Sequence, residues 1–499
     1  MQARPRPATL DPSDRGAVAA LRSALGSRGY DAQRLRTLLR AEGDNLTPRA
    51  GDIPIVERLL PRGDPLSALV RLFLIGRPVS ERDAAAALAP LTIDAAVSIG
   101  ILERQPEQVI ATVRLVPAED LVFACDLALE SAPDLPADHV MGVTTSSLTL
   151  AHATIRRNVG SVLDVGTGCG VQAVFAARHA ARVIACDINP RALNFAAFNA
   201  VLNGVTNMEC RRGSFFDPVG TERFDLIVSN PPFVISPEGG LTFRDAGMRG
   251  DAVSRSMVRG AASHLTEGGL AFVLVSWGVS DGADWVAPLR EWTADIGCDA
   301  LFLQHTRESA MGYAASWNAP LQSQPERYAA TVDRWLAYLT ALNFASVSYG
   351  TSILRRRAGE NWLRAEEVTA PRASDAGPRI AALIATQDLL AGLTSDAPLL
   401  DARPRLDPAH RLDQTLRARR SAFVVDSAVL RLESGLRFEA AVDAFIAHLL
   451  ARLDGTVRLR DAIRDTVVQL DAGPDELESA CLPIIRRLLA LGFLTVETS

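Results

Sequence analysis

The sequence predicts an α/β fold in the middle of the chain, with mostly helical domains before and after it. Three short apolar runs carry this prediction, and each is interpreted as a buried strand: 162–165, 182–186 and 224–229. The first leads into a glycine-rich turn, the second ends on an aspartate, and the third runs into Asn-Pro-Pro-Phe. Buried apolar strands with a glycine turn after the first are typical of a parallel, nucleotide-binding, Rossmann-like sheet.

The length of 499 residues predicts about three domains. We place them at 1–129 (mostly helical), 130–360 (the sheet domain) and 361–499 (mixed helix and strand). The net charge of −6 excludes a uniformly basic protein that coats nucleic acid, but it leaves room for a local basic face.

The six cysteines and seven histidines show no metal-ligand spacing, so we expect no metal. The start of the chain lacks the apolar segment of a signal peptide. The longest clean apolar run, 270–275, is strand-length and too short to span a bilayer. We therefore expect a cytoplasmic protein without a membrane partner.

The N-terminal part has the outline of a winged helix. Ser80 is a candidate N-cap for a helix over 81–88, a second helix is expected over 92–98, and 108–115 alternates like a strand pair. One interpretation is nucleic-acid binding through a helix-turn-helix, and the other is a packing or protein-contact module. The helices are rich in alanine, with few side chains that could reach bases, which favours the second interpretation.

In the middle domain, a proline-rich linker over 130–138 precedes a helix over 148–157. A charged, glycine-rich loop over 236–250 follows the third strand. Further helices are expected over 171–179, 251–265, 281–296 and 327–342, and further strands over 270–275, 299–304 and 347–354.

After a second linker at 366–378, we expect helices over 379–390, 438–450 and 475–491 and a hairpin around Ser434-Gly435. The segment 492–496 repeats the helix, glycine, strand order of 98–102, which is compatible with a second winged-helix-like unit.

The glycine turn is a candidate cofactor site. Gly166, Gly168 and Gly170 have the spacing G-x-G-x-G, and glycine allows positive φ and close approach of a ligand. Asp187 follows Asp164 by 187 − 164 = 23 positions, near the roughly 20 expected of an acid that binds ribose hydroxyls. The alternative for Asp187 is a helix N-cap ahead of Pro190.

Ser214 and Phe215, after another short strand, fit a contact with an adenine edge, and their alternative is an ordinary turn and core residue.

Asn230, Pro231, Pro232 and Phe233 suit a flat substrate that carries an NH₂ group. The prolines fix φ and leave rigid carbonyls. The Asn230 amide oxygen and the Pro231 carbonyl can accept the two N–H bonds, while Phe233 stacks on the plane. Accepting both bonds pushes the nitrogen lone pair out of conjugation, so the pattern calls for in-line positioning without a classical general base.

These segments resemble motifs I, II and IV of class I S-adenosylmethionine-dependent N-methyltransferases, and most of all the small methyltransferase group. That group includes release-factor glutamine methyltransferases and ribosomal RNA methyltransferases. The resemblance covers about 140–357 and implies a seven-stranded sheet with S-adenosylmethionine over the glycine turn. The implied cofactor contacts are Asp164, Gly166, Thr167, Gly168, Gly170, Asp187, Ile188, Asn189, Ser214, Phe215 and Asn230. The implied catalytic residues are Asn230, Pro231, Pro232 and Phe233.

The substrate is less determined. Phe233, where release-factor enzymes of the group usually have tyrosine, favours an exocyclic amine of a nucleobase, with RNA as the favoured partner. The arginine runs 355–357 and 417–420 are candidate phosphate contacts or solvated surface, and Arg244, Asp245 and Arg249 are candidate substrate contacts. A glutamine side chain of a protein partner is the second hypothesis, and a catalytically inactive binding scaffold the third. A dehydrogenase is disfavoured because the glycine spacing is wrong for a dinucleotide.

Overall fold

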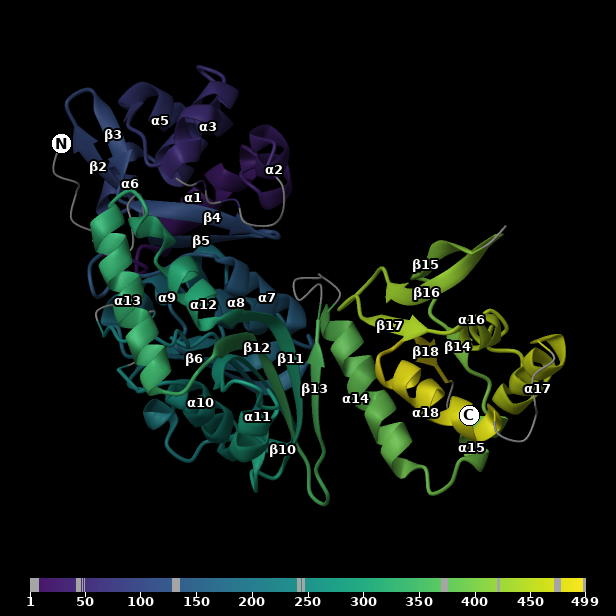
Figure 1. Ribbon diagram of the computed structural model, residues 1–499. Helices are drawn as coiled ribbons and strands as arrows, with labels where there is room; N and C mark the ends of the chain where they lie inside the picture. Colours follow the sequence, from purple (N-terminus) through teal and green to yellow (C-terminus); the bar gives the residue numbers. More distant parts are fainter. Residues whose placement is uncertain are drawn as a thin grey trace. The chain divides into compact units, whose positions relative to one another are not determined.

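The computed structural model of the chain describes residues 9–41, 46, 48, 50–127, 135–239, 244, 247–368, 376–419, 422–470 and 477–496. The chain divides into two compact units (Figure 1). The first is Met1–Ala151 with Arg156–Glu366, and the second is His152–Ile155 with Glu367–Ser499. The predicted boundary at 129/130 falls inside the first unit, so the three-domain division stays a prediction.

The first unit contains an eight-stranded sheet with the order β13-β11-β12-β10-β9-β6-β7-β8. Strands β6 to β10 pair in parallel, whereas β12 is antiparallel to both β10 and β11. The strands are β6 (Val159–Val165), β7 (Ala180–Asp187), β8 (Met208–Arg212), β9 (Phe224–Ser229), β10 (Leu265–Val279), β11 (Cys298–Ser309), β12 (Ser346–Arg356) and β13 (Leu363–Glu367). The predicted count of seven is therefore one short, because β13 pairs at the edge beside β11.

Three helices connect neighbouring parallel strands: α8 (Val171–Ala177), α9 (Pro190–Leu202) and α10 (Ala252–Ser263). Helix α11 (Ala287–Thr293) lies between β10 and β11 in the chain, and α7 (Thr145–Ala153) precedes β6. Helix α7 begins and ends a few residues earlier than the predicted 148–157. The helix predicted over 281–296 is shorter than expected. Gly282 has a φ of +66°, and the Asp284 carboxylate accepts the backbone N–H of Val286, so a turn occupies the expected first part of that helix.

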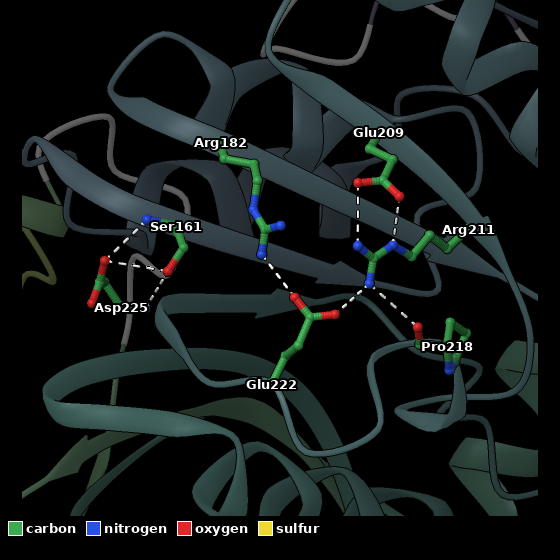
Figure 2. A network of polar contacts seen from close by, with 7 residues as sticks. All are labelled: Ser161, Arg182, Glu209, Arg211, Pro218, Glu222 and Asp225. Carbon is green, nitrogen blue, oxygen red and sulfur yellow. Dashed lines mark hydrogen bonds and ion pairs between the residues drawn. The ribbon is translucent and has the colours of Figure 1, made fainter.

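Polar contacts hold the loops at the sheet (Figure 2). The Asp225 carboxylate on β9 accepts the backbone N–H of Ser161 on β6 at 3.0 Å. Arg211 on β8 and Arg182 on β7 both donate to Glu222, at 2.5 and 2.8 Å, and Arg211 also donates to the Pro218 carbonyl. The contacts of the two arginines fix the 213–222 loop between β8 and β9, and the Asp225 contact joins β9 to β6.

Two helices, α12 (Ala310–Trp317) and α13 (Pro325–Ala341), lie between β11 and β12, with a 3-10 turn η5 (Ala319–Leu321) between them. The predicted helix over 327–342 is α13, whereas α12 was not predicted. Both contribute to a small apolar core that includes Tyr313, Trp335 and Ile235.

In the N-terminal part, a three-stranded sheet has the order β1-β3-β2, and two helices lie between β1 and β2 in the chain. The interpretation of this part as a winged helix stays a prediction. Ser80 accepts the Asp83 N–H at 3.1 Å as the predicted N-cap. The second helix begins one residue later than expected because Thr92 caps it. The elements are α1 (Arg15–Ser27), α2 (Ala32–Leu39), η1 (Ala50–Asp52), α3 (Ile53–Leu59), α4 (Pro65–Leu69), η2 (Val70–Leu74), β1 (Val79–Ser80), α5 (Glu81–Leu88), α6 (Ile93–Ser98), β2 (Leu102–Gln105) and β3 (Gln108–Ala111).

The residues predicted as one strand pair over 108–115 belong to two sheets. After β3, the chain forms a separate, buried hairpin of β4 (Val113–Ala118) and β5 (Leu121–Asp126).

Helix α9 pairs with the edge of this hairpin through asparagine side chains. The Asn199 amide accepts the Ala124 N–H at 2.7 Å and donates to the Ala124 carbonyl at 2.9 Å. Asn203, one turn later, makes the same two bonds to Val122 at 3.0 and 2.8 Å. The backbone groups of the buried strand are satisfied by side chains of α9, which join the N-terminal part to the sheet domain.

The second unit combines helices with a three-stranded sheet, β15-β16-β17, and a small pair, β14-β18. Its elements are α14 (Ala376–Gly392), α15 (Ala397–Asp401), β14 (Arg405–Leu406), β15 (His410–Arg419), β16 (Ala422–Leu432), β17 (Glu439–Val442), α16 (Ala444–Leu450), α17 (Leu459–Leu470), α18 (Leu477–Ala490) and β18 (Leu494–Thr495).

Several predictions for this unit are confirmed, and one is wrong in part. The helix over 379–390 lies within α14, and the predicted hairpin around Ser434-Gly435 joins β16 to β17. Residues 439–442 are a strand and not helix, because they pair with 428–431. The helix predicted over 475–491 is α18, and 475–476 lie outside the described residues.

The predicted similarity of 98–102 and 492–496 has a structural basis. Gly100 and Gly492 have φ values of +84° and +79°, and each ends its helix. In both places the next residue donates its N–H to the carbonyl five positions earlier, which is the Schellman pattern.

We expect Asn199→Ala to lower the free energy of unfolding of the first unit by roughly 3 kcal/mol, because it leaves several buried backbone groups unpaired. Asn203→Ala should cost only about 1 kcal/mol, because water reaches that half-buried position. Urea unfolding followed by tryptophan fluorescence measures this, since all six tryptophans lie between Trp277 and Trp362. Equal losses in the two variants would contradict the proposed role of Asn199.

Candidate active site

A cavity of about 520 Å³ lies where the carboxyl ends of β6, β7, β8 and β9 meet. This is the edge at which open α/β sheets bind their ligands. Its walls include most of the residues predicted for the site: Gly166, Thr167, Gly168, Asp187, Ile188, Asn189, Ser214, Phe215, Asn230, Pro231, Pro232 and Phe233. Of the residues predicted to bind the cofactor or to be catalytic, Asp164 and Gly170 do not line it.

The three glycines of the turn have different roles. Gly166 and Gly168 have φ values of +70° and +55°, and a Cβ atom added to either would meet no atom within 4 Å. Their open side leaves room for a ligand. Gly170 has a φ of +86°, and a Cβ atom there would lie 3.1 Å from the Cα atom of Ala196. Gly170 therefore allows α9 to pack closely against the turn.

Asp164 is buried behind the turn. One carboxylate oxygen accepts the Thr167 hydroxyl at 2.6 Å and the Ala173 N–H at 3.0 Å. The other oxygen has no hydrogen-bond partner among the described residues. Burial raises the pKa of Asp164 to about 7. Asp164 thus supports the turn, and its unpaired oxygen leaves it able to accept one more donor.

The Asp187 carboxylate holds the turn from the end of β7. Its two oxygens accept the backbone N–H groups of Gly168 and Asn189, both at 2.9 Å, and burial raises its pKa. The N-cap of α9 is Asn189, whose side chain accepts the Arg191 N–H, so the interpretation of Asp187 as that cap is wrong. Ile188 next to it is 57% exposed and offers an apolar surface to the cavity.

Phe215 has a φ of +44°, a backbone conformation that is rare for a bulky residue. The neighbouring Phe216 stacks on His264 with ring centroids 4.7 Å apart, which anchors the loop. Strained residues of this kind cluster at ligand sites, where the surrounding structure holds them. The interpretation of Phe215 as a mere core residue does not explain its place in the cavity wall.

The segment 230–233 continues from β9. The Ser229 hydroxyl donates to the Val165 carbonyl at 2.7 Å and fixes the end of the strand. The Phe233 N–H donates to the Pro231 carbonyl at 2.8 Å, and the Phe233 ring lies 5.0 Å from that of Tyr349. The Asn230 side chain has no hydrogen bond to another described residue, so its amide is available to a ligand.

Several cavity residues were not predicted. They come from the segment before and within α7 and from helices α8, α9 and α12: His139, Val140, Met141, Gly142, Thr144, Ser146, Ser147, Val171, Gln172, Ala192 and Trp317. Gln172 donates to the Ser147 carbonyl at 2.7 Å and fixes this segment against α8. The run of hydroxyl residues at 144–147 is the one sequence signal that could have pointed to it.

The arginines of the run 355–357 have partners within the chain. Arg355 and Arg357 pair with the buried Asp299 at 2.6 and 3.0 Å, and Arg356 donates to backbone carbonyls. In the second run, Arg417 pairs with Asp426 at 2.9 Å, and Arg420 lies outside the described residues.

Of the loop residues predicted to touch substrate, Arg244 lines the cavity and pairs with Glu238 at 3.1 Å. Arg249 donates to the Ala341 carbonyl and does not line the cavity, and Asp245 lies outside the described residues.

The cysteines near the site are packed thiols. Burial raises the pKa of Cys169 well above its usual value and that of Cys186 to about 12. Neither is a nucleophile at neutral pH. The described part of the chain has no cluster of His, Cys, Asp and Glu that could hold a metal, and none of its helices is long and apolar enough to cross a membrane.

Comparison with known families identifies three segments. Residues 142–277 match the methyltransferase small domain. The flanks match two domains of unknown function, DUF7059 at 27–112 and DUF7782 at 381–496. Together with the strand order, the first match shows a class I methyltransferase fold, here with eight strands.

Among curated relatives, a release factor glutamine methyltransferase of Xylella fastidiosa is 33% identical over 168 residues, which are 31% of this chain and 60% of the relative. A ribosomal protein uL3 glutamine methyltransferase of Bradyrhizobium diazoefficiens is 41% identical over 127 residues (22% and 40%). A ribosomal RNA small subunit methyltransferase C of Escherichia coli is 35% identical over 130 residues (26% and 34%). The chain thus spans about a third to three fifths of the length of these relatives.

The raised pKa of Asp164 makes the stability of the first unit depend on pH. Because the folded-state pKa of about 7 exceeds the ordinary value of 3.8, the folded state holds a proton that the unfolded state releases. Between pH 5 and pH 8 the wild type should lose roughly 2–3 kcal/mol of unfolding free energy relative to Asp164→Asn. Urea titrations of both proteins at the two pH values measure this difference, and a constant difference would contradict burial as the cause.

Proposed function

We propose that the protein is an S-adenosylmethionine-dependent N-methyltransferase that acts on a planar, amine-bearing group. The observation that carries the proposal is the shared cavity. The open glycine turn and the Asn230 amide, which has no partner among the described residues, line the same walls. This shared cavity supports the proposal of a cofactor site beside a receptor for an N–H group.

The cavity residues fit this cofactor. The open side of Gly166 and Gly168 can admit the amino-acid part, and each Asp187 oxygen keeps a lone pair for a ribose hydroxyl. Ile188 and Phe215 offer apolar surface to an adenine. When bound, S-adenosylmethionine supplies an electrophilic methyl group on a sulfonium centre.

The residues after β9 hold the acceptor. The Asn230 amide oxygen accepts one N–H of the target amine. The Pro231 carbonyl already accepts the Phe233 N–H, but its second lone pair can accept the other N–H of the target amine. Both bonds draw the nitrogen lone pair out of conjugation, and the Phe233 ring supports the plane of the group. Positioning and this polarisation supply the catalysis, so no side chain needs to remove a proton in the methyl-transfer step.

For the acceptor we propose an exocyclic amine of a nucleobase, with RNA favoured over DNA. Phe233 supports this choice because an apolar ring suits a base. The second candidate is the side-chain amide of a protein glutamine, which the names of two of the relatives favour. Both acceptors present a planar NH₂ group, so the same residues serve either reaction.

We expect Asn230→Ala to lower kcat by about 100-fold or more, because it removes an acceptor that polarises the target nitrogen. Its affinity for S-adenosylmethionine, measured by calorimetry, should stay close to that of the wild type. Phe215→Ala should show the opposite pattern, with weaker cofactor binding.

The assay follows a labelled methyl group from the cofactor into ribosomal RNA, transfer RNA and protein from the same cell. Label in RNA supports the nucleobase proposal, and label in protein alone transfers the proposal to glutamine. Normal turnover by Asn230→Ala would refute the mechanism. Absence of cofactor binding to the wild type would instead indicate a binding scaffold.

A further inference from the structure

The helical insertion between β11 and β12 contacts the segment that follows the proposed catalytic residues. The hydroxyl of Tyr313 on α12 is bonded to the backbone N–H of Ile235 at 2.9 Å, two residues beyond Phe233. Tyr313, Trp335 and Ile235 share one small apolar core. Helix α12 therefore contacts the segment that directly follows residues 230–233.

Helix α13 fixes the same segment from a second point. Glu238 accepts Arg334 at 2.5 Å and the indole N–H of Trp335 at 3.4 Å. The Tyr338 hydroxyl is bonded to the N–H of Gly250 at 2.9 Å. The insertion thus contacts both the beginning and the end of the loop that follows Phe233.

One aromatic residue of this insertion reaches the cavity. Trp317 lies one helical turn after Tyr313, with their ring centroids 6.1 Å apart, so the anchored tyrosine places it. It lines the cavity and is 37% exposed, and its indole N–H has no hydrogen bond to another described residue. The exposed part of this indole is a large apolar surface in the cavity wall.

The strand order of the sheet indicates which side of the cavity Trp317 lines. The order runs β11-β12-β10-β9-β6-β7-β8. The glycine turn, Asp187 and Phe215 follow β6, β7 and β8, whereas Trp317 follows β11 on the other side of β9. Trp317 therefore lies toward the side of Asn230 that faces away from the proposed cofactor residues.

We propose that Trp317 stacks on the target base of an RNA substrate, as a second aromatic wall besides Phe233. Trp317 would thereby favour a nucleobase over a glutamine side chain as the acceptor. A flat base that is splayed out of a single strand can be held between aromatic rings, and such stacking is insensitive to sequence. A glutamine side chain has no ring, so a second aromatic wall would have no ring to stack on. The inference deepens the proposed function and rests on Asn230 as the receptor of the amine.

The test uses the full chain and a fluorescein-labelled, mixed-sequence RNA decamer, with binding followed by anisotropy in the presence of S-adenosylhomocysteine. Trp317→Leu should weaken binding by about tenfold or more, because one base stack is lost. Trp317→Phe keeps a ring and should stay within about threefold of the wild type. Met311→Ala is the matched control, because Met311 lies on the same helix, is 58% exposed and does not line the cavity.

A second readout separates this inference from the proposed function. In methyl transfer to RNA, Trp317→Leu should raise KM, while the affinity for S-adenosylmethionine measured by calorimetry stays unchanged. Wild-type protein that binds the decamer but methylates no RNA would refute RNA as the acceptor in the proposed function, and the anisotropy series would still test the stacking role of Trp317. Equal RNA binding by Trp317→Leu and the wild type, no RNA binding by the wild type, or a loss confined to protein methylation would each overturn the stacking role.

Discussion

The buried side-chain amide of Asn199 joins three parts of the first unit. Its oxygen accepts from Ala124 in the N-terminal hairpin, and its nitrogen donates to Ala124 and, at 2.8 Å, to the Cys169 carbonyl in the glycine turn. Both amide protons and one oxygen lone pair are used in a position that is 0% exposed. Because an unpaired polar group would be costly there, these bonds stabilise the observed arrangement of the turn, α9 and the hairpin. The shape of the candidate cofactor site therefore depends on a module outside the methyltransferase small domain.

The sequence predicts the parallel part of the sheet and most of the candidate site, because both rest on local patterns. Buried strands are continuous apolar runs, and the turn, Asp187 and Asn230 each stand directly after one. Parallel strands bring their carboxyl ends to one edge, so residues far apart in the chain meet without any long-range information. The errors follow the same logic. Residues 439–442 have a helical pattern, but their strand partners at 428–431 decide their state.

Contacts that depend on tertiary structure could not be predicted. In the sequence, nothing distinguishes Trp317, which lies at the end of a short helix, and only the folded structure shows that it lines the cavity. The backbone N–H of Ile235 donates to the hydroxyl of Tyr313 on the same helix. For the arginine run 355–357, the sequence could not show the internal counter-ion. Three consecutive arginines indicate a basic surface, but the buried Asp299 is distant in sequence and takes two of them. A charge run predicts a partner only when no internal counter-ion exists.

The cavity is preorganised by the same groups that would bind the cofactor. Asp187 accepts the Gly168 N–H, so the acid proposed for the ribose also holds the turn, and the neighbouring Phe215 has a strained backbone with a φ of +44°. At Asn230, in contrast, no bond to another described residue holds the amide. A cofactor would thus meet a wall already in place, whereas the proposed acceptor would itself complete the hydrogen bonding of Asn230. Under the proposed function, a group without N–H donors would leave the Asn230 amide unsatisfied, which would select against it.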